Sequence, residues 1–152
     1  MAQRHAARVW AAQADADEIE RLKRALPAVV GRFPGGRSTV SVVAEGLAPP
    51  TQAAREKLIE ILNENANDLA CIAVVVSGSS GFASSALRSM HTGLRFATPR
   101  NYEMGVLANV EDAAVWLSPR HAAKTGVVLD PVKLVEVVAR LQAAAANADS
   151  LE

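Results

Sequence analysis

Apolar and polar positions alternate along this chain in a way that predicts strands separated by helices. Runs rich in β-branched residues predict strands at 39–45 and 71–76, and shorter runs predict strands at 7–12 and 104–107. Apolar residues that recur every three or four positions predict helices between them. This order indicates one α/β domain with a sheet of four to five strands, mixed or parallel, joined by crossover helices.

The helical stretches begin and end at residues suited to those places. Asp17 and Glu20 form a pair like a capping box at the start of the first helix. Pro27 lacks a backbone donor, so this helix is expected to kink or end there. Asn109 is a candidate N-cap for a later helix, and Pro119 is expected to end that helix.

The last helix has the clearest start signal. Asp130 is placed to act as N-cap, Pro131 takes the first helical position, and Leu129 can pack on Leu134 as a hydrophobic staple. An apolar stripe then continues along the helix through Val132, Val135, Val138 and Leu141. This helix, predicted at 131–146, either covers the sheet or mediates self-association.

Composition narrows the classes of function. The chain of 152 residues fits one domain, and its 16 basic and 16 acidic residues give no net charge. Proteins that bind nucleic acid through phosphates carry a basic excess, so we expect no nucleic-acid partner. No apolar run approaches the length of a membrane span and no secretory signal opens the chain, so a cytoplasmic location is expected.

The chain has few of the residues that most often act in catalysis or metal binding. Cys71 is the only cysteine and opens the most apolar run, so we expect a buried small hydrophobe, not a nucleophile. His5, His91 and His121 are scattered without metal-ligand spacing. Ser80 and His91 would lie roughly 15 Å apart along one segment, too far for a catalytic pair. The sequence therefore predicts no enzyme activity, no metal site and no cofactor.

One glycine-rich turn joins the buried strand at 71–76 to a helix. Its residues are Ser77, Gly78, Ser79, Ser80 and Gly81. Free N–H groups at such a helix start can hold a phosphate or carboxylate, and Arg88 follows in that helix. The spacing matches neither a Walker A motif nor the dinucleotide and nucleophile-elbow motifs. A plain backbone turn is favoured, and an anion or ligand loop remains the alternative.

Several short motifs together resemble a STAS-type domain, the module of sulphate transporters and anti-sigma-factor antagonists. They are Pro50 to Arg55, Gly81-Phe82, Ala86 to Ser89, Thr92 to Leu94, and Glu111 to Leu117. The likeness is closer to uncharacterised bacterial STAS-like proteins grouped with CRAL-TRIO lipid-transfer domains. It covers residues 7–118, which leaves 119–146 as a C-terminal extension and 147–152 as a disordered tail or tag remnant.

The resemblance implies a non-enzymatic regulatory or scaffolding module that acts through protein–protein contacts. STAS-type antagonists carry a phosphorylatable serine in an Asp-Ser-Ser-Gly turn, and this chain has residues 45–51 at that place, where Thr51 is the nearest hydroxyl. The implied partner surface includes Gly46, Leu47, Thr51 and Arg55. The partner is another protein, with a homodimer as one possibility. The alternative function is binding of a lipid or a phosphorylated metabolite.

Overall fold

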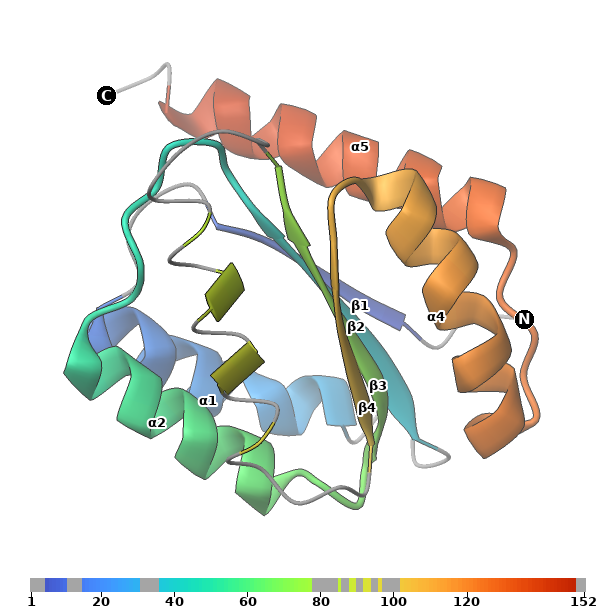
Figure 1. Cartoon of the computed structure of the whole chain (residues 1–152), viewed down its shortest axis with the longest axis horizontal. Helices are drawn as coiled ribbons and strands as arrows, with labels where there is room; N and C mark the ends of the chain where they lie inside the picture. The colour runs from blue at the N-terminus through green and yellow to red at the C-terminus, as the bar shows by residue number, and fades with distance from the viewer. Residues whose placement is uncertain are drawn as a thin grey trace.

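The computed structural model describes residues 5–10, 15–30, 36–77, 85, 88–89, 92–93, 96 and 102–149. Its sheet has four strands in the order β1-β2-β3-β4, and each neighbouring pair is parallel (Figure 1). The strands are β1 (His5–Trp10), β2 (Arg37–Val43), β3 (Leu69–Val76) and β4 (Glu103–Leu107). The α/β class predicted from the sequence is confirmed.

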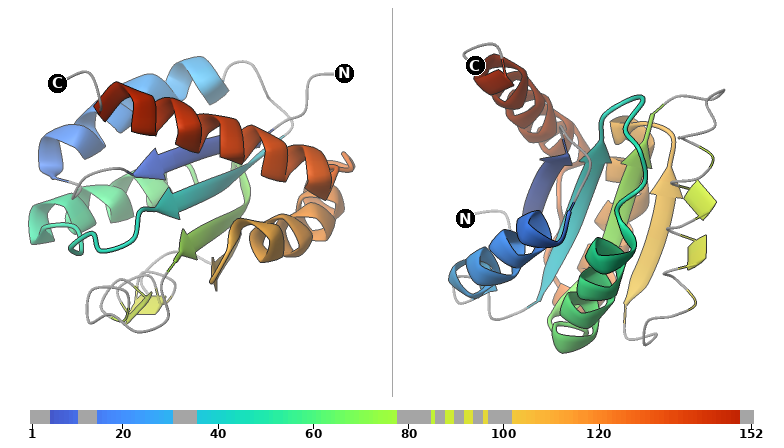
Figure 2. Two further views of the ribbon diagram at one scale, coloured as in Figure 1. Left: turned by 90° about the horizontal axis from the view of Figure 1, so that it is seen from above. Right: turned by 90° about the vertical axis from the view of Figure 1, so that its left-hand side faces the viewer.

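Helices cover both faces of the sheet, as the two views in Figure 2 show. They are α1 (Ala16–Val30), α2 (Gln52–Glu64), α4 (Val110–Thr125) and α5 (Pro131–Asp149). The pair α1 and α2 lies on one face. On the other face α4 packs on β2, β3 and β4, while α5 packs on α4 and β1. The result is a three-layer sandwich with the sheet in the middle.

The central strand β3 is buried along its whole length, which confirms the prediction that both of its faces are covered. Alternate side chains point to opposite faces of a strand. Cys71, Ala73 and Val75 belong to the core beneath α4 and α5. Ile72 and Val74 belong to the core on the side of α2. The chain therefore builds two apolar cores that share this strand.

Helix α4 is longer than the sequence indicated. Asn109 caps it as predicted, because its Oδ1 accepts the Asp112 N–H at 2.7 Å. The prediction that Pro119 ends the helix is wrong, because α4 continues to a left-handed Gly126 (φ 73°). Proline removes one helical hydrogen bond, but Leu117 and His121 on either side of it are fully buried. Their packing against the sheet holds the helix together through the proline.

Helix α1 also differs from its prediction, most clearly at its start. Asp15 is the capping side chain, since its Oδ1 accepts the Glu18 N–H at 2.8 Å, so the pair assigned to Asp17 and Glu20 is wrong. The helix continues past Pro27 to Val30, so of the kink or end expected at this proline only the end is excluded. Two of the described helices, α1 and α4, therefore continue through a proline.

Helix α5 covers the sheet, which was one of the two roles considered for it. Leu134 and Val138 are buried in the core shared with β2, β3 and α4. Asp130 caps the helix as predicted, with its Oδ1 accepting the Val132 N–H at 3.0 Å. The helix runs through Asp149, into the stretch assigned to a tail. The proposed boundary between residues 118 and 119 lies inside α4, so the extension and the preceding domain share one core.

Candidate functional site

The predicted partner surface lies where β2 leads into α2, at the carboxyl edge of the sheet. Gly46 is exposed in a left-handed conformation (φ 79°), and a Cβ there would meet nothing within 4 Å. Leu47 is half-buried and packs against the core on the α2 side. Thr51 and Arg55 are exposed. We call these four residues the carboxyl-edge surface; they form one contiguous loop and helix start.

Thr51 has a structural role within this surface. Its Oγ1 accepts the Ala54 N–H at 3.2 Å and so caps α2. Arg55 follows one turn later, and its backbone N–H donates to the Thr51 carbonyl at 3.0 Å. Among the residues that the structure describes, no carboxylate forms an ion pair with the Arg55 guanidinium. The start of α2 therefore presents a solvated cation, and the loop that leads into this helix carries the half-buried Leu47.

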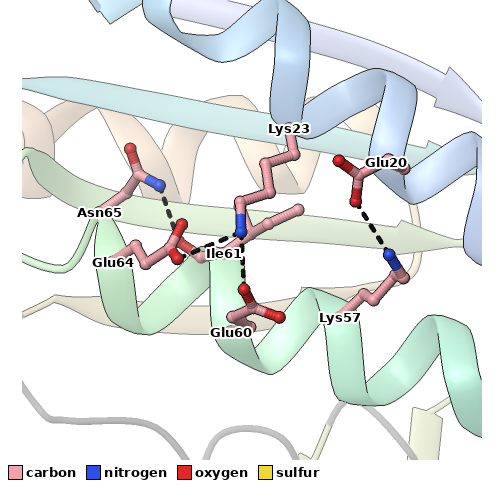
Figure 3. Close-up of polar contacts among 7 residues, drawn as sticks. All are labelled: Glu20, Lys23, Lys57, Glu60, Ile61, Glu64 and Asn65. Carbon is pink, nitrogen blue, oxygen red and sulfur yellow. Dashed lines mark hydrogen bonds and ion pairs between the residues drawn. The ribbon is translucent and has the colours of Figure 1, made fainter.

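The remainder of α2 is tied to α1 by ion pairs across the two helices (Figure 3). Lys57 Nζ lies 2.9 Å from Glu20 Oε2, and Lys23 Nζ lies 2.6 Å from Glu60 Oε1 and 3.1 Å from Glu64 Oε1. The hydrogen bond from Lys57 lowers the pKa of Glu20, and that from Lys23 lowers the pKa of Glu60. These charges are paired within the chain, in contrast to Arg55.

Part of the glycine-rich turn can be placed beside the next strand. Ser77 is half-buried, while Gly78, Ser79, Ser80 and Gly81 lie outside the described residues. Arg88 Nη2 donates to the carbonyl of Val76 at 3.0 Å. A guanidinium is thus held at the carboxyl end of β3, next to the start of that turn.

A buried polar cluster between the sheet and α4 was missed by the sequence reasoning. Ser38 Oγ lies 2.8 Å from His121 Nδ1 and 3.1 Å from Cys71 Sγ. All three residues are 0% exposed. Cys71 is thus buried as predicted, and burial raises the pKa of its thiol, which disfavours the reactive thiolate. No substrate can reach this cluster while α4 lies on the sheet.

The sequence contained only a weak indication of this cluster. Ser38 precedes the β-branched run of β2 by one position, so the strand predicted at 39–45 does not include it. His121 lies after Pro119, where the helix was expected to have ended. With α4 extended to its true end, His121 falls one turn after Leu117 and so on the face that packs on the sheet.

Polar contacts hold the same helix at the edge of the sheet. Arg120 Nε lies 2.6 Å from Glu103 Oε2 on β4, and the guanidinium lies 4.3 Å from the centre of the Trp116 ring. Lys124 Nζ donates to the carbonyl of Leu69 at the start of β3. The amino-terminal end of the sheet is therefore where α4 is held by polar groups.

A buried arginine lies at this same end of the sheet, on the face opposite to α4. Arg37 is 3% exposed, and its Nη2 donates to Asn65 Oδ1 at 2.9 Å. Within the described structure its Nε and Nη1 atoms are buried without a hydrogen-bond partner. Burial lowers the pKa of Arg37, and the nearby Asp68 carboxylate opposes that effect. This arrangement is energetically unfavourable.

Comparison with known proteins identifies no relative of this chain, so its function has to be argued from the fold and the geometry of the site. No protein-family model, no curated protein and no solved structure matches the chain. In the described segments, no helix has the length and apolarity that crossing a membrane requires. Nor do the residues placed by the structure include a group of three or more histidine, cysteine or acidic side chains suited to hold a metal ion.

Proposed function

We propose that this chain is a STAS-like module that acts without catalysis, by binding a partner protein through the carboxyl-edge surface. The observation that supports this most is that one short segment, residues 46–55, carries the exposed Gly46, Thr51 and Arg55 together with the half-buried Leu47. The alternation of strands and helices from β1 to α4 also supports the STAS-like resemblance. The resemblance itself supplies the regulatory or scaffolding role.

The start of α2 is not paired with α1, whereas the remainder of the helix is, and this difference supports placing the interface at the helix start. Lys57 and Glu60 are engaged by α1, so a partner that recruited them would first have to break ion pairs within the chain. Arg55 is exposed and has no such pair to break among the described residues. A carboxylate on the partner can therefore bind the Arg55 guanidinium, while an apolar side chain covers Leu47.

A photo-reactive amino acid at position 55 tests the proposal in the cells that produce the protein. Position 140, an exposed arginine on α5, is the matched control because α5 lies on the opposite face of the sheet. We expect one specific crosslinked protein from position 55 and none from position 140. Equal crosslinking from both positions would contradict the assignment of this surface.

The crosslinked protein is then purified and its affinity is measured by isothermal titration calorimetry. Leu47→Asp and Arg55→Glu are expected to weaken binding at least about tenfold, which corresponds to the loss of about 1.4 kcal/mol. Arg140→Glu reverses a charge elsewhere and should leave the affinity unchanged. Full affinity in both surface variants would refute the proposal.

Binding of a lipid or phosphorylated metabolite is the second candidate. It is supported by Arg88, whose guanidinium is held at the carboxyl end of β3 beside Ser77. Carboxyl ends of parallel strands are the usual place for ligands in open α/β sheets. Native mass spectrometry of freshly purified protein should then show a bound mass that is lost in Arg88→Gln. A bare protein mass would count against this candidate.

A further inference from the structure

One face of strand β2 is polar, although the strand lies inside the sheet between β1 and β3. Thr39 and Ser41 alternate with Val40 and Val42, which belong to the core beneath α4 and α5. Alternate side chains of a strand point to opposite faces, so Thr39 and Ser41 point to the face on which α1 and α2 lie (Figure 2). Inner strands of a parallel sheet covered by helices carry mostly apolar residues on both faces. Strand β2 departs from that pattern on this one face.

Arg37 extends the polar row toward the start of the strand. Its Nη2 atom donates to Asn65 at the end of α2, which places the side chain on the same face. Every second residue of a strand is spaced by about 6.6 Å, so the row spans about 13 Å. We call Arg37, Thr39 and Ser41 the β2 polar stripe.

The apolar side chains of α1 pack on α2 instead of on this stripe. All members of the apolar cluster around α1 belong to these two helices: Ile19, Leu26, Ala54, Leu58 and Ile61. On β3, the register partners of Thr39 and Ser41 are apolar residues of a separate core, Ile72 and Val74. On β1, the register partner of Ser41 is Arg8. The stripe is therefore bordered by apolar positions on β3 and by a second arginine position on β1.

The polar groups of the stripe lack partners within the described part of the chain. Arg37 is 3% exposed, and its Nε and Nη1 atoms are buried without a hydrogen-bond partner. No described carboxylate forms an ion pair with it, and Asp68 favours its charged form only from a longer distance. The Thr39 and Ser41 side chains are half-buried and form no hydrogen bond with the described residues. Buried polar groups are normally hydrogen-bonded, so these groups need a partner that the described chain does not supply.

We propose that the β2 polar stripe binds a small molecule that carries an oxyanion at one end and hydroxyl groups along its length. The Arg37 guanidinium binds the phosphate or carboxylate of this molecule, because its planar set of donors suits both groups. The Thr39 and Ser41 hydroxyls can each donate and accept, so they match the hydroxyl groups of the ligand. These two residues are partly exposed, so the ligand reaches the stripe from water, with the buried Arg37 at its closed end.

An NMR titration of the intact, isotope-labelled protein with glycerol phosphate and with glycerate tests this inference. Both probes carry alcohol groups and an oxyanion, which is a phosphate in the first and a carboxylate in the second. We expect at least one probe to shift the amide signals of residues 37–41 with a dissociation constant below about 10 mM. Inorganic phosphate and acetate, which lack the alcohol groups, should bind at least about tenfold more weakly.

The contrary results of this titration are equally specific. No binding of either probe would overturn the proposal and would mean that water alone fills the stripe. Signal shifts confined to residues outside β2 would overturn the assignment of the site. Equal affinity for inorganic phosphate or acetate would overturn the role of the two hydroxyls.

Variants assign the binding to the stripe. Arg37→Met removes the guanidinium and should weaken binding at least about tenfold. Ser41→Val replaces a hydroxyl by an apolar side chain suited to a strand, and should weaken binding at least about threefold. Arg140→Met removes an exposed arginine on α5 and should bind like the parent. Parent-like affinity in Arg37→Met or in Ser41→Val contradicts the proposal.

The stripe and the carboxyl-edge surface have no residue in common. Arg37→Met and Ser41→Val leave Leu47 and Arg55 in place, so partner binding and ligand binding are tested by different variants. Failure of one proposal is therefore distinguishable from failure of the other.

Discussion

Gly105 of β4 lies directly beneath the ring of Trp116 on α4. A Cβ added to Gly105 would lie 2.8 Å from both Cε2 and Cζ2 of that ring, closer than side-chain carbons approach one another. The absence of a side chain on the strand is thus what allows α4 to pack closely on β4. The Arg120 guanidinium lies over the same ring.

Gly105→Ala should therefore be destabilising. Overpacking a tight contact costs about 1–3 kcal/mol in the free energy of unfolding, because the ring and the helix must move together. Urea unfolding followed by circular dichroism measures the change. Gly93→Ala is the control, since Gly93 is exposed and helical and a Cβ added there would meet nothing within 4 Å, so it should leave stability unchanged or raise it by up to about 1 kcal/mol. Equal stability of the two variants would show that the Trp116 contact does not constrain the strand.

Removing the buried charge of Arg37 should stabilise the protein. Its Nε and Nη1 atoms are buried without hydrogen-bond partners among the described residues. An apolar side chain of similar length avoids that desolvation, so Arg37→Met is expected to raise the free energy of unfolding by about 1 kcal/mol or more. Arg140→Met, at an exposed site, controls for the general effect of losing an arginine. A marked loss of stability in Arg37→Met would mean that the guanidinium stabilises the fold.

The Cys71 thiol should make stability fall at alkaline pH. Its pKa in the folded protein is raised by burial above the ordinary value of 9.0, so the unfolded chain loses this proton first. The stabilising contribution is complete below about pH 9 and is lost as pH rises toward the folded pKa. Unfolding free energies should decline less between about pH 8 and pH 10 in Cys71→Ala than in the parent. An identical decline in both proteins would contradict the raised pKa.

Breaking the ion pairs between α1 and α2 should have a small effect. Lys23 bonds both Glu60 and Glu64, but all three side chains are substantially exposed. Pairs between exposed side chains add little to stability, so Lys23→Met should lower the free energy of unfolding only slightly. The difference from the parent should shrink at high salt. A larger loss, unaffected by salt, would point to packing instead of charge.

The strands were predictable from the sequence because their signal is local. Every residue of β3 is apolar. A strand needs apolar residues at all positions only when both of its faces are covered. Helix caps at Asn109 and Asp130 were equally predictable, since a cap bonds an N–H only two or three residues away. The α/β class follows from these local signals alone.

The end of α4 could not be predicted, because tertiary packing decides it. Pro119 weakens a helix locally, and nothing in the sequence states that the buried His121 beyond it packs on the sheet. The Ser38–His121 contact joins residues 83 positions apart, so it depended on that helix end and on the sheet register. The candidate partner surface was located through the family resemblance; its exposure is a result of the structure.

The central claim is that the carboxyl-edge surface binds a partner protein. The most direct test is the dissociation constant of the protein crosslinked at position 55, measured with the parent, Leu47→Asp and Arg140→Glu. We predict that Leu47→Asp weakens binding at least about tenfold while Arg140→Glu matches the parent. A Leu47→Asp affinity equal to that of the parent would contradict the claim.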